Sequence, residues 1–324
     1  MALLEVQNLK TYYKTLRGAV KAVDNVSFKL EQGEALGLAG ESGCGKTTIA
    51  LSILKILPPG GKIIDGHIYF DGQDIVKVRE SEFRKKIRWK GISIVFQGAM
   101  NALNPVYKVG DQIIEAIRLH EKVTKKEAQE RVERLLNLVG IEPSRANHYP
   151  HEFSGGMRQR ALIAMALACN PKLLIADEPG TALDVIVAAQ VLKLLRELKE
   201  KLNLAMILIT HDLSIIAETC EKTAIMYAGK IAEFADTVSV FKKPLHPYTQ
   251  GLLGAFPNIK GERTRIASIP GTPPDLLNPP TGCRFHPRCK YGMEICRVKE
   301  PEFLEVEKGH FVSCHLVGGK EGNY

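Results

Sequence analysis

The chain has 324 residues, 45% of them hydrophobic and 25% charged, with a formal net charge of +8. It is long enough for one sizeable core with an appendage, or for two domains. No apolar run approaches the roughly 18–20 residues of a membrane helix, and the start lacks the layout of a signal peptide. These features exclude a membrane-spanning protein and predict a cytoplasmic one. The densest basic run, 84–90, is interleaved with apolar residues and predicts a solvated face rather than a nucleic-acid surface.

The first elements in chain order are two predicted edge strands within residues 3–30, separated by a turn at Arg17-Gly18. Their residues alternate between apolar and polar, which is the period of a half-buried strand. Tyr12 and Tyr13 lie between the two alternating runs. An aromatic ring at this point can stack on a flat base or pack against the sheet, and the residue type alone favours neither.

Residues 40–48 read GESGCGKTT, after an apolar segment at 35–39 and before an apolar run at 49–57. Strand, glycine loop and helix are the context of the phosphate-binding pattern G-x-x-x-x-G-K-[ST]. The glycines let successive backbone N–H groups converge on phosphate oxygens, and the helix adds its positive N-terminal end. Lys46 would reach the β- and γ-phosphates, and the Thr47 hydroxyl would hold Mg²⁺. The sequence therefore predicts a site for a nucleoside triphosphate.

The middle of the chain alternates predicted strands with predicted helices. Residues 66–75 predict a hairpin with Asp71-Gly72 at its turn, and residues 91–96 predict a strand that ends at Gln97. Residues 98–151 are charged, with apolar residues at three- and four-residue spacing. That spacing predicts a helical insertion in an otherwise α/β domain.

The next stretch places polar residues at element ends. Ser154 is the predicted N-cap of a helix whose free N–H groups form a second anion site. The strand at 173–176 ends in Asp177 and Glu178. Because adjacent strand residues face opposite ways, one carboxylate can serve a metal while its neighbour faces the attacking water. The elements expected to follow are a helix at 185–202, a strand at 205–210 that leads to His211, and one further strand at 223–234.

The chain has seven cysteines, which in a cytosolic protein favour a metal site or incidental core use over disulfides. Cys44, Cys169 and Cys220 are expected to be structural. The other four lie in a Pro/Gly-rich segment too short for a core of its own, which predicts a metal or cluster site, although incidental buried thiols are the alternative. Zinc usually takes C-x2-4-C pairs, so the wider spacing here favours an iron–sulfur cluster. The four are Cys283, Cys289, Cys296 and Cys314, and His286, His310 and His315 leave mixed ligation open.

Together these motifs resemble the nucleotide-binding subunits of ABC transporters. Over roughly 230 residues the chain carries, in order, the P-loop, the Q-loop residue Gln97, the signature FSGGM (153–157), the strand LLIADE (173–178), the D-loop ALD (182–184) and the switch residue His211. The chain departs from the family pattern in two motifs. Phe153 and Met157 replace the signature's usual Leu and Gln, which puts a ribose contact by residue 157 in question. Gly180 stands where Thr or Ser is commoner, which would loosen the D-loop turn.

The resemblance implies a role for each motif residue. Glu178 would be the general base or would polarise the attacking water, and His211 would contact the γ-phosphate, with Lys46 and Gln97 completing the catalytic set. Thr47 and Gln97 would ligate Mg²⁺ directly, and Asp177 would hold it through water. Tyr13, rather than Tyr12, would stack on adenine. The residues implied to hold ATP are Tyr13, Gly40, Ser42, Gly43, Cys44, Gly45, Lys46, Thr47, Thr48, Gln97, Asp177 and Asp184, with Ser154 and Gly156 completing the ATP site of a partner subunit.

The implied fold is α/β: an ABC-type P-loop NTPase with a core mixed sheet, an antiparallel β subdomain, a helical signature subdomain and a small irregular C-terminal extension. The ATPase domain would span 1–235, with the helical subdomain at about 98–155. The extension would span 236–324, with the cysteine site at about 281–316.

The tail resembles one branch of this family. HPYT-x-GLL, a Pro-rich connection and the four-cysteine segment are similar to the C-terminal extension of oligopeptide/dipeptide importer ATPase subunits. This resemblance implies that the four cysteines ligate a 4Fe–4S cluster, and that the chain sits peripherally on the cytoplasmic face of the membrane. The implied partners are a second, similar ATPase subunit in a heterodimer, two membrane permeases and an extracellular binding protein. The permeases would contact the helical insertion and the loop at 98–110.

Three other interpretations compete with this one. Related subunits with such a tail also serve oligosaccharide importers, so the cargo follows only from the resemblance. A soluble ABC ATPase acting on nucleic acid would usually carry two cassettes or a long coiled coil, and this chain has one cassette and no heptad run. A redox domain with an attached ATPase would need a substrate pocket or an electron partner, which nothing besides the cysteines indicates. We therefore expect no nucleic-acid partner.

Overall fold

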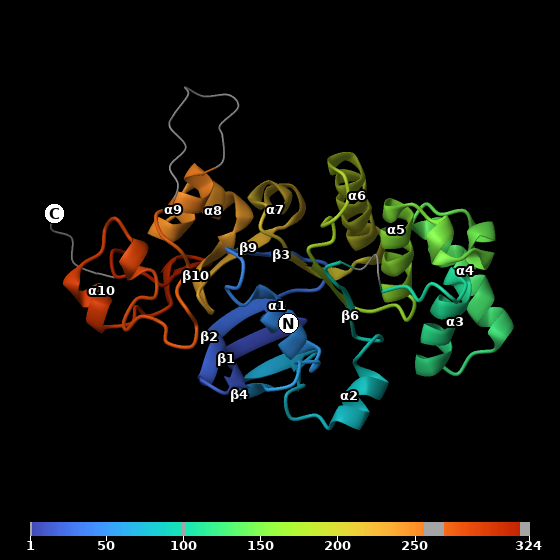
Figure 1. Ribbon diagram of the computed structural model, residues 1–324, viewed down its shortest axis with the longest axis horizontal. Coiled ribbons are helices and arrows are strands. Elements are labelled where there is room, and N and C mark those ends of the chain that lie inside the picture. The colour runs from blue at the N-terminus through green and yellow to red at the C-terminus, as the bar shows by residue number, and fades with distance from the viewer. Residues whose placement is uncertain (1, 99–101, 256–268, 318–324) are drawn as a thin grey trace. The chain divides into compact units, whose positions relative to one another are not determined.

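The computed structural model describes residues 2–98, 102–255 and 269–317, in two compact units whose segments interleave along the chain (Figure 1). The first unit comprises Met1–Leu3, Leu30–Ala35 and Lys77–Ile209. The second unit comprises Leu4–Lys29, Leu36–Val76 and Thr210–Tyr324. The second unit therefore includes residues from both sides of the expected boundary at 235, and that boundary stays a prediction.

The second unit contains a four-stranded sheet in the order β2-β1-β4-β5. β1 pairs antiparallel with β4, from Leu4 opposite Phe70 to Tyr13 opposite Gly61. The tight turn that joins β4 to β5 has positive φ at Asp71 (51°) and Gly72 (78°), as the sequence predicts for an Asp-Gly hairpin. The strands are β1 (Leu4–Thr15), β2 (Gly18–Leu30), β4 (Gly61–Phe70) and β5 (Gln73–Asp74). This sheet is the expected antiparallel β subdomain.

The second unit also contains strands of a mixed sheet, in the order β11-β12-β10-β9-β3. β3 pairs parallel with β9, whereas β10 pairs antiparallel with both β9 and β12. The bounds are β3 (Ala35–Ala39), β9 (Lys222–Tyr227), β10 (Lys230–Asp236), β11 (Leu304–Glu307) and β12 (His310–Val312). Every residue of β3 is buried. β12 brings the C-terminal region into this sheet, which the sequence patterns did not predict.

The segment at 223–234 is a hairpin, so the expectation of one continuous strand is wrong. β9 ends at Tyr227 and β10 begins at Lys230, with positive φ at Ala228 (48°) and Gly229 (85°) between them. Two successive left-handed residues reverse the chain direction, and glycine adopts that conformation without steric cost. The apolar residues on both sides of this short turn conceal it in the sequence.

Short helices complete the second unit. α8 packs on β9 and β10, and α9 packs on β10. α1 ends at Ile53, earlier than the apolar run to residue 57 predicts, because Lys55 is left-handed (φ 53°). The helices are α1 (Lys46–Ile53), α7 (Leu213–Thr219), α8 (Thr237–Lys242), α9 (Pro247–Gly254), η4 (His286–Arg288) and α10 (Glu294–Val298).

The first unit has three parallel strands in the order β8-β7-β6. They are β6 (Ile92–Val95), β7 (Leu173–Asp177) and β8 (Ala205–Ile209). All residues of β7 and β8 are buried, because strands of a parallel sheet are usually covered on both faces. This burial explains why both strands are nearly continuous apolar runs.

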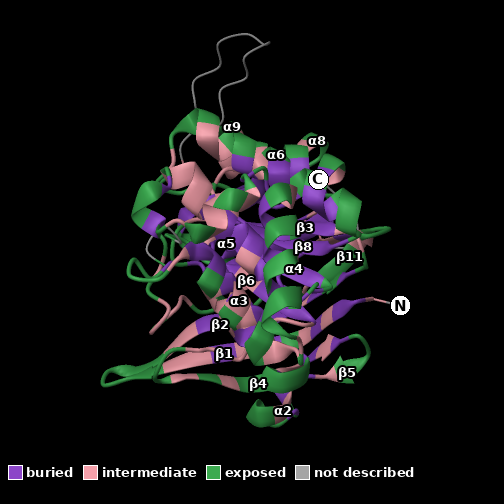
Figure 2. Ribbon diagram, turned by 90° about the vertical axis from the view of Figure 1, so that its right-hand side faces the viewer, coloured by how far each residue is buried: buried purple, intermediate pink, exposed green. Residues whose placement is uncertain are grey.

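Helices form the rest of the first unit. α3, α4 and α5 pack on one another, and α5 also packs on α6 and β6. α4 begins with a capping box between Thr124 and Glu127, and its exposed positions lie outside a buried stripe that includes Val132 and Leu136 (Figure 2). The helices are α2 (Glu80–Lys86), α3 (Val109–His120), α4 (Lys125–Leu138), η2 (Pro143–Asn147), η3 (Pro150–Glu152), α5 (Gly155–Ala166) and α6 (Val185–Leu202). Within the described ranges no helix is long and apolar enough to cross a membrane.

Candidate nucleotide site

The phosphate-binding loop connects β3 to α1 in the second unit. Gly40 has φ +146°, and a Cβ on it would lie 2.2 Å from the carbonyl oxygen of Met226. Gly45 caps α1 with φ +108°, and a Cβ there would lie 2.2 Å from the carbonyl oxygen of Ala22. Both positions therefore need glycine for close packing as well as for backbone conformation. The loop leaves the N-terminal N–H groups of α1 without a side-chain cap, as an anion site requires.

Lys46 is buried beside this loop. Its ammonium donates to the carbonyl oxygens of Gly40 (2.7 Å) and Glu41 (3.1 Å). Ser42, Gly43 and Thr47 are exposed. The cation, the hydroxyls and the start of α1 thus lie within one nine-residue stretch that can bind an anion by charge and by backbone N–H groups.

Cys44 lies on the inner side of the loop. Burial raises the pKa of its thiol, and a Cβ on Gly40 would lie 2.9 Å from its sulfur. Cys169 and Cys220, the other two cysteines expected to be structural, are also buried, and that role stays a prediction for all three. Any contact that Cys44 makes with a phosphate therefore comes from its backbone.

The two tyrosines of β1 have different partners. The Tyr12 hydroxyl donates to Asp24 (2.9 Å), and burial together with that hydrogen bond raises the pKa of Tyr12 to about 12. The Tyr13 hydroxyl lies 3.4 Å from Oγ1 of Thr48, in the first turn of α1. Tyr13 is thus the tyrosine beside the phosphate-binding loop, and its stacking on adenine stays a prediction.

The other predicted residue of the second unit is His211. It is exposed and directly precedes Asp212, which caps α7 by accepting a hydrogen bond from the Ser214 N–H (2.8 Å). His211 follows the end of β8, as the sequence predicts. Its contact with a γ-phosphate stays a prediction.

In the first unit, Gln97 and Glu178 lie together. The amide nitrogen of Gln97 donates to Oε2 of Glu178 (2.8 Å). The Thr181 hydroxyl donates to the same oxygen (2.9 Å), and the Glu178 N–H bonds the Ile209 carbonyl (2.8 Å). Glu178 has φ 45°, so its backbone departs from the strand just after the buried Asp177. The structure therefore fixes one carboxylate at a strand end, oriented by an amide and a hydroxyl.

Thr181 is a residue that the sequence argument missed. The commoner Thr or Ser is absent at Gly180, and the hydroxyl that holds Glu178 comes from the next residue. The turn keeps two backbone hydrogen bonds, since the Thr181 N–H bonds the Glu178 carbonyl (3.1 Å) and the Leu183 N–H bonds the Gly180 carbonyl (3.2 Å). Whether Gly180 loosens this turn stays a prediction. The sequence did contain a signal for the contact of Thr181 with Glu178, because EPGTALD has a threonine one position after the place where the family usually has Thr or Ser.

The signature segment and the D-loop adjoin in the first unit. Ser154 caps α5 by accepting from the Met157 N–H (3.3 Å), as predicted. Asp184 caps α6 by accepting from the Val187 N–H (2.9 Å). A Cβ on Gly156 would lie 2.5 Å from Cγ1 of Val187, so the start of α5 needs glycine to approach α6. Ser154 and Asp184 are exposed at these two helix starts.

The four C-terminal cysteines do not form a site for a single metal ion. Over the described part of the chain, no three or more His, Cys, Asp or Glu side chains are placed to hold a metal ion. The histidines considered as mixed ligands bond other groups: His286 pairs with the Cys283 carbonyl, His310 with Glu233 and His315 with the Lys299 carbonyl. The expected iron–sulfur site therefore has no support from this geometry. Burial raises the pKa of the Cys283 and Cys314 thiols to about 11, which favours the neutral thiol.

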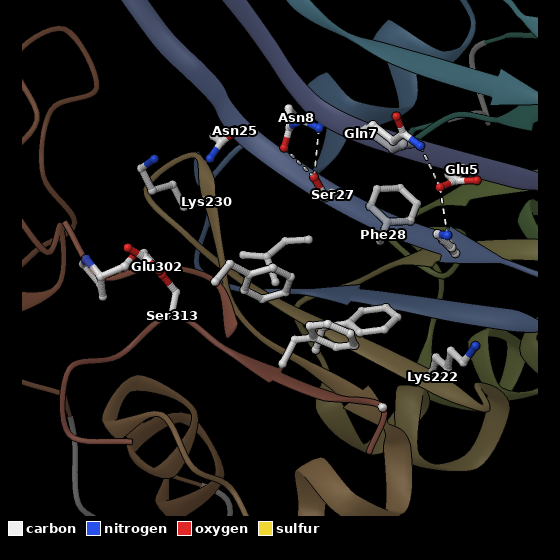
Figure 3. A pocket seen from close by; sticks show the side chains of 18 of the residues that line it. Glu5, Gln7, Asn8, Asn25, Ser27, Phe28, Lys222, Lys230, Glu302 and Ser313 are labelled. Carbon is white, nitrogen blue, oxygen red and sulfur yellow. Dashed lines mark hydrogen bonds and ion pairs between the residues drawn. The ribbon is translucent and has the colours of Figure 1, made fainter. Parts of the chain in front are cut away.

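A separate hollow of about 630 Å³ lies in the second unit (Figure 3). Its wall includes Phe28, Phe234 and Phe311, and none of the predicted nucleotide residues lines it. Two of its lysines have acidic partners in the wall itself, since Lys29 pairs with Glu5 and Lys230 with Glu300. The hollow is therefore distinct from the phosphate-binding loop.

Two family models match the chain. The model described as "ABC transporter" matches residues 23–181, and the one described as "Oligopeptide/dipeptide transporter, C-terminal region" matches residues 232–296. A solved structure, the dimeric post-hydrolysis state of the ATP-binding cassette MJ0796 bound to ADP and Pi, aligns with a TM-score of 0.64 and 28% identity, covering 72% of this chain and 98% of that one.

The fold and the P-loop place the protein in the class of ABC-type P-loop ATPases. Two relatives, both from Bacillus subtilis (strain 168), narrow the family. The chain is 47% identical to the oligopeptide transport ATP-binding protein OppD (97% of this chain, 89% of the relative) and 47% identical to the dipeptide transport ATP-binding protein DppD (97% and 94%). The chain belongs to the family of ATP-binding subunits of oligopeptide and dipeptide ABC transporters.

Proposed function

We propose that this ATPase is the peripheral subunit, on the cytoplasmic face of the membrane, that powers the uptake of oligopeptides or dipeptides through an ABC importer. The observation that carries the ATPase part is the Glu178 carboxylate, held by Gln97 and Thr181 at the end of β7. The choice of peptides as the transported substrate is supported by the C-terminal region at 232–296, which matches the family model of oligopeptide/dipeptide transporters. The proposed division is an ATPase domain at 1–235 and an extension at 236–324.

The phosphate-binding loop holds ATP in this proposal. Lys46 exchanges its bonds to the Gly40 and Glu41 carbonyls for the β- and γ-phosphates, and backbone N–H groups of the loop point at the same oxygens. Tyr13 stacks on adenine beside Thr48. Ser42, Gly43, Cys44 and Gly45 contribute backbone contacts.

The residues proposed for Mg²⁺ are Thr47, Gln97 and Asp177. A hydroxyl, an amide and a carboxylate would supply the oxygen ligands that Mg²⁺ prefers. The amide nitrogen of Gln97 bonds Glu178, which leaves the amide oxygen as the atom that would ligate the metal. When bound, Mg²⁺ neutralises charge on the β- and γ-phosphates. Asp177 is buried at the end of β7, and we propose that it holds Mg²⁺ through water.

We assign the handling of the proton in the hydrolytic step to Glu178. Glu178 accepts a hydrogen bond from the attacking water, and Gln97 and Thr181 fix the carboxylate that does so. His211 donates to the γ-phosphate. The charge that develops on the phosphate oxygens is stabilised by Lys46.

Pairing with a second, similar ATPase subunit completes the proposal. Ser154 and Gly156 at the start of α5 would contact the nucleotide of a partner placed head to tail, because the dipole of a helix N-terminus favours a phosphate. Asp184, at the start of α6, belongs to the proposed ATP site of this chain. We expect a heterodimer beneath two permeases, fed by an extracellular binding protein. Isolation of a complex that contains only this ATPase chain with two permeases would contradict the heterodimer.

The proposed permease contact is the helical insertion with the loop at 98–110. Residues 99–101 of that loop lie outside the described residues, and α3 begins at Val109. Deletion within the loop should leave ATP hydrolysis and abolish its coupling to uptake. Unchanged uptake would contradict this assignment.

The decisive experiment reconstitutes the full complex in proteoliposomes with its binding protein. ATP hydrolysis and uptake are measured with a tetrapeptide, a dipeptide and an oligosaccharide as cargo. Stimulation by a peptide alone supports the proposal. Stimulation by the oligosaccharide alone would overturn the peptide assignment while leaving the ATPase assignment intact.

A 4Fe–4S cluster held by the four C-terminal cysteines is the second part of the proposal. This part rests on the resemblance of the tail to the C-terminal extension of oligopeptide/dipeptide importer subunits, since in the described part of the chain the side chains form no site for a metal ion. Iron and sulfide analysis after anaerobic purification tests it. About four of each per chain supports the cluster, and zinc without sulfide, or no metal, overturns it.

A further inference from the structure

Glu41, the second residue of the phosphate-binding loop, is held by a residue far along the chain. Nη1 of Arg288 donates to Oε2 of Glu41 (2.6 Å), and Nη2 donates to Oε1 (3.0 Å). The Arg288 side chain is 6% exposed and that of Glu41 is 28% exposed. Two parallel charge-assisted hydrogen bonds between planar groups fix orientation as well as distance. Position 41 is one of the variable positions of the P-loop pattern, so sequence reasoning assigned it no role.

The backbone of Glu41 is held as well. The Glu41 N–H donates to the hydroxyl of Tyr248 (3.0 Å), a fully buried residue of α9. The Glu41 carbonyl accepts from the ammonium of Lys46 (3.1 Å). The carboxylate, the N–H and the carbonyl of one loop residue therefore have three separate partners, two of which come from the region after residue 236.

Arg288 is itself fixed before it reaches the loop. Its Nε donates to the Pro270 carbonyl (2.7 Å), and Nη1 also donates to the Tyr227 hydroxyl (3.3 Å). The hydrogen bonds to Glu41 raise the pKa of Arg288 above its already high ordinary value, so the guanidinium stays charged. Tyr227, Tyr248 and Phe285 pack edge to face or tilted, with ring centroids 4.6 to 5.3 Å apart. This aromatic cluster ties the Arg288 segment to β9 and α9.

We propose that Arg288 is a positioning residue for ATP binding: through Glu41, the C-terminal region sets the conformation of the phosphate-binding loop. Lys46 must leave the Glu41 carbonyl to reach a phosphate. The loop must keep its backbone conformation while the Lys46 side chain moves. Arg288 and Tyr248 hold the other two groups of Glu41 during that exchange. Without Arg288 the Glu41 carboxylate is left partly buried without its cationic partner, and the loop keeps only the Tyr248 contact from the C-terminal region.

The test measures the Kd of a fluorescent ATP analogue and the KM and kcat of hydrolysis on the full chain. Arg288→Gln should raise the Kd and the KM for ATP about tenfold or more while kcat at saturating ATP changes less than about threefold. Arg288→Lys keeps the charge but not the two-pronged geometry, so its Kd should lie between those of the wild type and Arg288→Gln. Glu41→Gln should match Arg288→Gln, and the double variant should be no worse than either single one.

Two controls separate the possible outcomes. Glu300→Gln removes a carboxylate from another ion pair of the C-terminal region, with Lys230, and should leave the Kd within about twofold. Lys46→Ala should abolish binding, because this inference rests on the proposed phosphate site. If Lys46→Ala still binds ATP, the proposed site itself is wrong. Two results would overturn the positioning role when Lys46→Ala fails to bind ATP. In the first, Arg288→Lys and Glu41→Gln bind ATP as the wild type does. In the second, the effects of Glu41→Gln and Arg288→Gln on the Kd simply add in the double variant.

Discussion

The carboxylate of Glu178 is positioned by single-residue contacts. One of its oxygens accepts from both the Gln97 amide (2.8 Å) and the Thr181 hydroxyl (2.9 Å). The positive φ of Glu178 lets the chain turn away from β7 at this point, so the side chain leaves the buried sheet while Asp177 stays within it. A carboxylate oriented in this way can align a water molecule, whereas a freely rotating one would do so less often.

Glu178→Gln is predicted to slow ATP hydrolysis about 10²- to 10⁴-fold and to leave ATP binding intact, because an amide of the same shape cannot take a proton. Single-turnover hydrolysis and the Kd of the fluorescent nucleotide measure the two effects. Thr181→Val is the matched control, since it removes one orienting bond and keeps the carboxylate, and its loss should be smaller. A Glu178→Gln enzyme with near wild-type turnover would assign the activating role to another group.

At the level of elements, α9 illustrates a helix start built from buried polar groups. His246 caps α9 through its ring nitrogen Nδ1, which accepts from the Tyr248 N–H (2.9 Å). The Glu233 carboxylate on β10 accepts from the Leu245 and His246 N–H groups (2.8 and 2.9 Å) and pairs with His310 on β12. Burial lowers the pKa of His246 to about 4. Residues from β10, α9 and β12 thus form one buried network.

This network predicts a pH dependence of stability. The unfolded chain binds a proton at His246 near its ordinary pKa of 6.5, but the folded chain does so only near 4, so folding loses stability as the pH falls through this window. The full loss is about 3 kcal/mol. His246→Asn keeps a capping side chain without a titrating ring. Urea denaturation at pH 7 and pH 4.5 should show a smaller drop in unfolding free energy for this variant, and an equal drop would contradict the assignment.

At the scale of the whole molecule, the C-terminal region contributes strands and contacts to the second unit. β12 pairs with β10, with Glu233 opposite Val312 and Phe234 opposite Phe311. Arg284 bonds Asp24 and the Ala228 carbonyl, and Arg288 bonds Glu41. Removing this region would expose the edge of β10 and leave the buried Glu233 without its histidine partner.

We predict that a chain ending at residue 235 expresses as an aggregate or melts at least about 10 °C below the full chain, because several buried contacts are lost at once. Size-exclusion chromatography and a thermal melt of both proteins measure the difference. A soluble monomer that melts like the full chain would show that the ATPase domain at 1–235 is independent of the region after it.

The sequence by itself determined the features that depend on local spacing. The P-loop, the turn at Asp71-Gly72, the Ser154 cap and the α6 bounds at 185 and 202 all follow from residues a few positions apart, because turn conformation and helix capping are local properties. The ordered motifs likewise determined the ATPase class. The hairpin at Ala228-Gly229 was missed because apolar residues flank it on both sides.

Only the tertiary structure decided the contacts between distant segments. Arg288 and Glu41 are separated by 247 positions, and β12 joins β10 across more than 70 residues. No periodicity encodes such pairs, since they depend on which surfaces meet once the sheet has formed. The same holds for Thr181, whose hydroxyl reaches Glu178 only because the chain turns at a left-handed residue. Local spacing therefore determined where the nucleotide chemistry lies, and packing decided which distant residues hold it in place.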